Sequence, residues 1–146
     1  MKNTTLFWIP IAFYLGILFH KKRITVPITK TVTSYVYITP ESIDNKFSTE
    51  NLYQYIKALG IQHTDIVYKQ AILETGHFTS KVFKIKNNLF GFTYNSTLIS
   101  FANWKESVRY YANWQLRKYK KGDYYTFLKD IGYAQDTLYI HKLKNL

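Results

Sequence analysis

The sequence predicts a mostly helical (α+β) domain with one small β-hairpin, preceded by an N-terminal hydrophobic anchor. Three observations support this prediction. From residue 47 onward, apolar residues recur at helical spacing, and capping residues or glycines bound the segments. Only residues 92–101 combine two short runs with a turn sequence between them. The stretch Leu6 to Phe19 is apolar and free of charge.

The chain divides into three predicted regions: residues 1–23 as a membrane anchor or signal segment, 24–46 as a linker and 47–146 as the domain. Leu6 to Phe19 is shorter than the roughly 20 residues of a full span and has the length of a signal-peptide core. No small-x-small cleavage site comes after it, so we favour an uncleaved anchor over a removed signal. The basic run 20–23 conflicts with export of the domain, because such flanks are usually cytoplasmic.

Two helices are predicted first in the domain. One begins after Ser48 or Thr49 as its cap and ends at Gly60. Its apolar stripe consists of Leu52, Tyr55, Ile56 and Leu59. The other begins near Thr64 and is closed by Gly76.

A short third helix is predicted from Ser80, with Val82 and Phe83 as its apolar contacts. A hairpin is predicted next over residues 92–101, turning at residues 94–97.

Three further helices complete the predicted domain. The first starts at Asn103, which forms a capping-box-like pair with Glu106. Its inward positions are Trp104, Val108, Tyr111 and either Gln115 or Leu116. Asp123 and Asp136 are expected to cap two more helices, over residues 124–129 and 137–143.

Glu74 is the most informative single residue, because its carboxylate falls on the apolar side of a helix. Val67, Ala71 and Glu74 are spaced i, i+4, i+7 and so share one face. Desolvation and the negative end of the helix dipole would both favour a protonated carboxyl, as a general acid requires. The alternative is a carboxylate satisfied by a nearby lysine. Glu74 and His77 also spell Glu-x-x-His, but a single copy interrupted by Gly76 predicts no metal site.

Three ordered motifs carry a resemblance to a known family: QAILETGHFTSKVFKIKNNLFGF, FANWKESVRYYANW and GYAQDTLYIHKL. Together they resemble the glucosaminidase domain of glycoside hydrolase family 73, in its compact Bacteroidetes form, over roughly Phe47 to Leu146. The resemblance implies a lysozyme-like architecture and cleavage of the β-1,4 bond after N-acetylglucosamine in peptidoglycan. It places Glu74 in the position of the family's acid and implies a glycosidase, not an amidase.

The same resemblance implies further site residues. Tyr133 corresponds to a functionally important tyrosine of the family, although it could equally be a buried aromatic with a satisfied hydroxyl. Asn88 and the backbone of Phe90 and Gly91 match the family's NNLFG loop, which offers amide donors and close backbone approach to a sugar. The rings of Phe90 and Phe92 either stack on pyranose faces or fill the core.

A second catalytic carboxylate is difficult to find in this chain. No Asp or Glu lies between Glu74 and Glu106, and both Glu106 and Asp136 are explained as helix caps. The second catalytic group is therefore left open, and the alternative to a second carboxylate is a substrate-assisted route, in which the 2-acetamido group of the substrate attacks the anomeric carbon. Tyr133 would orient that group and stabilise the developing charge.

Composition limits the remaining possibilities. The absence of cysteine excludes disulfides, thiolate catalysis and cysteine-ligated zinc, and we expect no cofactor. The net charge of +11 favours anionic partners or reflects ordinary lysine-rich solubility. We expect peptidoglycan glycan strands and the inner membrane as partners, no nucleic acid, and a location on the periplasmic side of the cell envelope. The alternatives are a wall-binding module with an idle acid, and a basic nucleic-acid-binding protein with aromatics interleaved among lysines in residues 118–125.

Overall fold

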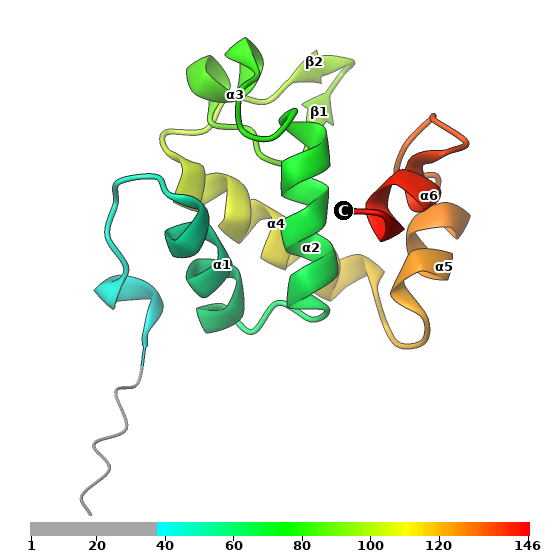
Figure 1. The fold of residues 1–146 in the computed structure, drawn as a ribbon, viewed down its shortest axis with the longest axis horizontal. Helices are drawn as coiled ribbons and strands as arrows, with labels where there is room; N and C mark the ends of the chain where they lie inside the picture. Colours follow the sequence, from blue (N-terminus) through cyan, green and yellow to red (C-terminus); the bar gives the residue numbers. More distant parts are fainter. Residues whose placement is uncertain (1–37) are drawn as a thin grey trace, which may run out of the picture. The chain divides into compact units, whose positions relative to one another are not determined.

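The computed structural model describes residues 38–146, and the predicted anchor and most of the predicted linker lie outside the described residues. Within residues 38–146, six α-helices and one two-stranded hairpin confirm the predicted fold class. No helix of this part is long and apolar enough to cross a membrane. The elements in chain order (Figure 1) are the 3-10 helix Pro40–Ser42, α1 (Thr49–Ala58), α2 (Thr64–Glu74), α3 (Lys81–Lys86), β1 (Thr93–Tyr94), β2 (Thr97–Leu98), α4 (Trp104–Lys118), α5 (Tyr124–Asp130) and α6 (Tyr139–Lys144).

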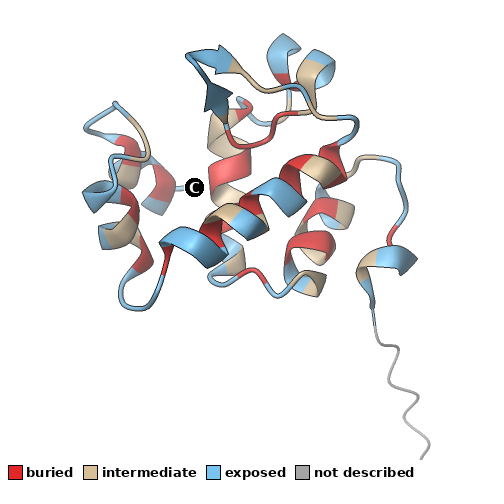
Figure 2. Cartoon of the chain, turned by 180° about the vertical axis from the view of Figure 1, so that it is seen from behind, coloured by how far each residue is buried: buried red, intermediate tan, exposed pale blue. Residues whose placement is uncertain are grey.

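Helix α2 occupies the centre of the domain. It packs against α1 on one side and α6 on the other, while α1 also contacts α4 and α5 contacts α6 (Figure 1). The inner faces of these helices carry the buried residues, coloured red in Figure 2. Val67 and Ala71 of α2 are completely buried, which confirms that the face shared with Glu74 is the inner one.

Four helix starts agree with the predicted caps. The side chains of Ser48, Ser80, Asn103 and Asp123 each accept the backbone N–H three residues ahead, at 2.8–3.1 Å. Each bond satisfies one of the amide donors that a helix start leaves without a partner. The hairpin is also as predicted. Its central residues Asn95 and Ser96 both have positive φ, of 45° and 59°, as a type I′ turn requires.

Two details differ from the sequence-based expectation, and one alternative that it left open is decided. Val82 is 43% exposed, so Phe83 alone anchors the short helix α3. Gln115, not Leu116, takes the inward position of α4, because its amide finds polar partners in the interior. Helix α6 begins at Tyr139 instead of residue 137. Asp136 therefore does not cap it, and instead accepts the N–H of Leu138 in a turn just before the helix.

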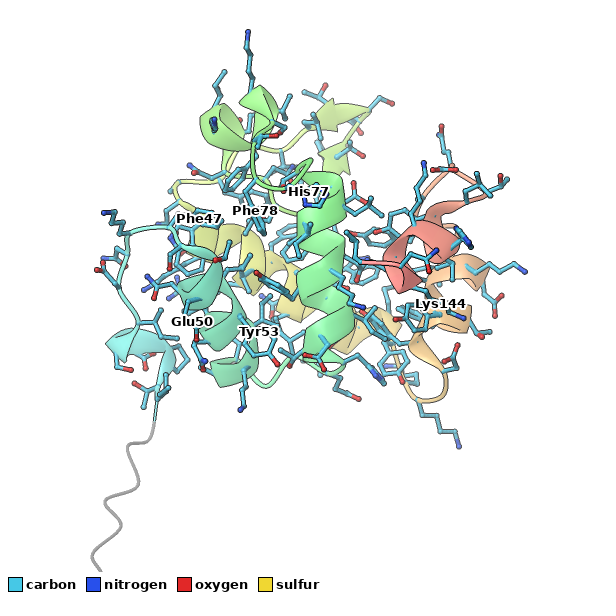
Figure 3. All side chains as sticks on the ribbon, viewed as in Figure 1. Phe47, Glu50, Tyr53, His77, Phe78 and Lys144 are labelled. Atoms are coloured by element: carbon cyan, nitrogen blue, oxygen red, sulfur yellow. The ribbon has the colours of Figure 1, made fainter. Side chains whose placement is uncertain are left out.

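The last residues of the predicted linker pack against the domain. Ile43 is buried, and the indole N–H of Trp104 donates to the carbonyl of Asn45 at 2.8 Å. Phe47 then joins an aromatic cluster, with its ring centroid 5.3 Å from that of Phe78 (Figure 3) and 5.0 Å from that of Phe83. These contacts attach the start of the domain to α3, to α4 and to the turn after α2.

Candidate functional site

Glu74 is the final residue of α2, and the chain reverses sharply after it. Gly76, at φ +56°, and His77 donate their N–H groups to carbonyls of the last helical turn, at 3.2 and 2.8 Å. This pair of bonds is a Schellman motif. The buried hydroxyl of Thr75 donates to the carbonyl one turn back at 2.6 Å and accepts the N–H of Phe78 at 2.9 Å. The backbone that carries Glu74 is therefore held on both sides.

The loop that contains Gly91 contacts the carboxyl of Glu74. A Cβ placed on Gly91 would lie 3.0 Å from Oε2 of Glu74, so only glycine leaves the carboxyl undisturbed. Asn88 holds this loop: its side-chain amide donates to the carbonyls of Phe92 and Ile99, at 2.8 and 3.0 Å, and its oxygen accepts the N–H of Phe92 at 3.1 Å. These bonds occupy the amide of Asn88, so in this structure it supports the loop.

The two aromatic residues of the loop have different roles: the ring of Phe90 packs in the core, and Phe92 lines a hollow. The ring of Phe90 is 2% exposed, and its centroid lies 4.3 Å from that of Tyr111, which favours the core alternative for this side chain. Its carbonyl accepts the hydroxyl proton of Tyr133 at 3.0 Å. Phe92 is half-buried and packs edge-on against Trp114. Phe92 thus has an accessible face, whereas Phe90 contributes only its backbone.

Three hollows adjoin at this place. The central hollow, of about 480 Å³, is lined by Glu74, Gly91, Tyr133, Asp136 and Tyr139 among others. A second, of about 340 Å³, shares Gly91 and Tyr133 with it and extends past Phe92, Trp114 and Lys118. A third, of about 550 Å³, shares Asp136 and Tyr139 with it and extends along α5 and α6. Such volumes fit ligand sites, and a central hollow that shares lining residues with two further hollows suits a linear polymer.

The surroundings of Glu74 favour its protonated form. Burial of the half-buried side chain raises the pKa of the Glu74 carboxyl, and the hydroxyl of Tyr139 partly offsets this by stabilising the carboxylate. In residues 38–146 the ion pairs join Arg109 to Glu106 and Lys142 to Asp136. Neither pair includes Glu74, so the lysine-satisfied alternative is not the one observed.

Tyr133 lies beside Glu74 in the central hollow. Burial raises the pKa of the Tyr133 hydroxyl, and the neighbouring Tyr139 and the Glu74 carboxylate act in the same direction. The hydroxyl therefore stays protonated and donates a hydrogen bond to the Phe90 carbonyl. The lone pairs of this oxygen can still accept a hydrogen bond.

Asp136 is the second carboxylate that lines the central hollow. Lys142, at 2.7 Å, and the N–H of Leu138, at 2.8 Å, lower the pKa of the Asp136 carboxyl and bind its two oxygens. In the part of the chain that the structure describes, no cluster of three His, Asp or Glu side chains could hold a metal ion.

Tyr139 is a site residue that the sequence reasoning did not single out. It is 7% exposed, belongs to α6 and lines the central hollow together with Glu74. A signal was present: Tyr139 and the buried Leu143 are spaced i, i+4, which places both on the inward face of the last helix.

The helical fold and the shielded carboxyl beside an extended hollow fit the glycoside hydrolase class, in which a protonated carboxyl donates to the glycosidic oxygen. The chain belongs to the glucosaminidase family, because the family model described as mannosyl-glycoprotein endo-beta-N-acetylglucosaminidase matches residues 49–146. This match confirms the family resemblance of the three motifs. Comparisons with curated proteins and with solved structures gave no significant match. Membership of the family supports, in general terms, hydrolysis of peptidoglycan glycan.

Proposed function

We propose that the chain is a peptidoglycan hydrolase that cleaves the β-1,4 bond after N-acetylglucosamine, with Glu74 as its general acid. The observation that carries this proposal is the Glu74 carboxyl itself, half-buried between the backbone of Gly91 and the central hollow. A carboxyl whose pKa is raised by burial keeps a proton available for a leaving oxygen.

The proposed reaction takes a substrate-assisted route. Glu74 protonates the glycosidic oxygen as its bond to the anomeric carbon breaks, and the carbonyl oxygen of the 2-acetamido group attacks that carbon to form a cyclic oxazolinium ion. The Glu74 carboxylate then takes a proton from a water molecule, which adds to the anomeric carbon and opens the ring. Glu74 thus acts first as acid and then as base, and ends the cycle protonated.

Tyr133 is assigned the orientation of the acetamido group. Its proton is donated to the Phe90 carbonyl, so its oxygen can accept the acetamido N–H. Accepting that bond increases electron density on the acetamido oxygen and stabilises the positive charge of the cyclic ion. Phe92, with one accessible face, is assigned contact with a neighbouring sugar ring.

The engagement of the other carboxylates supports this route over a two-carboxylate mechanism. Both oxygens of Asp136 are bound, by Lys142 and by the N–H of Leu138. Glu106 is paired with Arg109 and is not among the residues that line the central hollow.

The engagement of Asp136 and Glu106 also favours one alternative function, a module of this fold that binds glycan without cleaving it. In either case we propose a location at the cell envelope, on the periplasmic side, with the apolar segment Leu6 to Phe19 holding the protein to the inner membrane. The sequence of that segment is what supports this location.

The product distinguishes these possibilities. The full-length chain is incubated with purified peptidoglycan, new reducing ends are reduced with borohydride, and the reduced sugars are identified by mass spectrometry. Reduced N-acetylglucosamine supports the proposal, whereas reduced N-acetylmuramic acid indicates cleavage of the other glycosidic bond. Binding of the protein to peptidoglycan without new reducing ends identifies it as a glycan-binding module.

A further inference from the structure

A row of buried polar side chains crosses the domain and ends beside Glu74. Its members, here called the polar chain, are Gln115, Tyr124, Tyr111, Gln70 and Tyr139, all less than 8% exposed. Successive contacts measure 2.9 Å from Gln115 to Tyr124, 2.7 Å from Tyr124 to Tyr111, 2.6 Å from Tyr111 to Gln70 and 3.3 Å from Gln70 to Tyr139. Such a network is costly to bury unless every member finds a partner.

The far end of the polar chain fixes its direction. The side-chain oxygen of Gln115 accepts the backbone N–H of Gln62, and its nitrogen donates to the carbonyl of the same residue, both at 2.9 Å. A backbone N–H only donates and a carbonyl only accepts, so the Gln115 amide has one orientation. Its second N–H is therefore donated to the hydroxyl of Tyr124.

The same direction of donation continues along the polar chain. A hydroxyl carries a single proton, and when it is buried and already accepts a bond from one partner, it donates that proton to the partner that remains. Tyr124, which receives a bond from Gln115, donates to Tyr111, and Tyr111 donates to the side-chain oxygen of Gln70. The Gln70 amide is thereby oriented with its nitrogen toward Tyr139. The hydroxyl of Tyr139 is thus an acceptor toward Gln70.

The proton of Tyr139 is then left for another acceptor, and the Glu74 carboxyl belongs to a residue that lines the same hollow as Tyr139. We propose that the polar chain positions the catalytic acid: oriented by the backbone of Gln62, it directs the Tyr139 proton at the Glu74 carboxyl and stabilises that carboxylate. Gln70 and Tyr111 are then positioning residues that act through Tyr139. This inference rests on the proposed function only in calling Glu74 the acid.

The remaining ionisable groups around Glu74 do not replace Tyr139. Tyr133, Asp136 and Lys142 line the same hollow. Tyr133 donates to the Phe90 carbonyl, while Lys142 is paired with Asp136. Burial raises the pKa of the Glu74 carboxyl and the Tyr139 hydroxyl lowers it, and this opposition suits a group that must both give and take a proton.

The test is a pH titration of the Glu74 carboxyl by carbon-13 NMR, on the full-length chain labelled at the glutamate side chains. The sequence contains four glutamates, so the signals are few, and loss of one in Glu74→Gln assigns it. Tyr139→Phe should raise the Glu74 pKa by about one unit, because a bond that favours the charged form is lost. Tyr111→Phe and Gln70→Met should raise it by less, since Tyr139 remains but its proton is no longer directed.

Tyr119→Phe is the matched control. Tyr119 is also buried and packs on Tyr124, but its hydroxyl bonds to His63 and to the carbonyl of Gly122, outside the polar chain. This variant should leave the Glu74 pKa unchanged. Folding of each variant is judged by circular dichroism. If Gln70→Met fails to fold, Tyr111→Phe, which preserves the ring, still tests the interruption of the polar chain.

Two results would overturn the inference: no rise in Tyr139→Phe, or a rise in Tyr139→Phe with none in the folded Tyr111 and Gln70 variants. The titration requires no turnover, so it can succeed even if the protein proves to be a binding module. If the protein is active, the basic limb of its kcat/KM profile against pH should move upward with the measured pKa.

Discussion

Replacing Gly91 with alanine tests whether the loop backbone sets the position of the acid. The added Cβ would lie 3.0 Å from Oε2 of Glu74, so the carboxyl must retreat by a few tenths of an ångström. Because a misplacement of about 1 Å can cost about 10²-fold in rate, we expect kcat to fall by roughly 10-fold. Gly91 also has φ +68°, where a side chain costs about 1–2 kcal/mol.

Gly60→Ala separates these two effects. Gly60 has nearly the same φ, +67°, but a Cβ there meets no atom within 4 Å. Both variants should lose stability, by roughly 4–8 °C in Tm per kcal/mol for a domain of this size. Release of soluble fragments from peptidoglycan should slow only in Gly91→Ala. Equal rates in the two variants would show that the clash with Glu74 has no catalytic consequence, and that the loop does not position the acid.

The site and the N-terminal segment support three more predictions. Burial raises the pKa of Glu74 in the folded state, so ionisation of this carboxyl opposes folding above its unfolded pKa. Glu74→Gln should therefore match or exceed the wild-type Tm at pH 7. Thermal scans across pH should show that this difference vanishes in acid, where the wild-type carboxyl is protonated in both states. Tyr133→Phe should lower kcat by about 10²–10³-fold, whereas Asp136→Asn and Glu106→Gln should retain most of the wild-type kcat once stability is corrected. A thiazoline analogue of N-acetylglucosamine should compete with substrate. A large loss of kcat in Asp136→Asn or Glu106→Gln with none in Tyr133→Phe would indicate a second protein carboxylate. If residues 6–19 form an uncleaved anchor, the full-length protein should fractionate with membranes at its unprocessed mass, and a shortened soluble product would show a removed signal.

Local signals predicted most of the fold. Caps such as Ser48 and Asp123, and the pair Asn95 and Ser96 at the hairpin turn, act through atoms only two or three residues away, so they can be read directly from the sequence. The inward face of Glu74 could be predicted from helical spacing for the same reason.

The features of the fold and site that the sequence did not predict depend on contacts between residues far apart in the chain. Gln70 and Tyr139 are 69 positions apart, and no local pattern indicates that α6 brings its tyrosine against α2. The contact between Gly91 and Glu74 likewise forms only when the loop folds back over the helix end. Helix α6 starts later than predicted because the carboxylate of Asp136 is already used in the preceding turn and in its pair with Lys142.

The rate of glycan cleavage by Glu74→Gln decides whether Glu74 is the general acid. Full-length wild type and variant, matched by circular dichroism, are incubated with purified peptidoglycan, and the new N-acetylglucosamine reducing ends are counted over time. We expect steady release by the wild type and essentially none by the variant, because the glutamine amide is too weak an acid to protonate the leaving oxygen. Substantial release by Glu74→Gln would contradict the assignment of Glu74 as the acid.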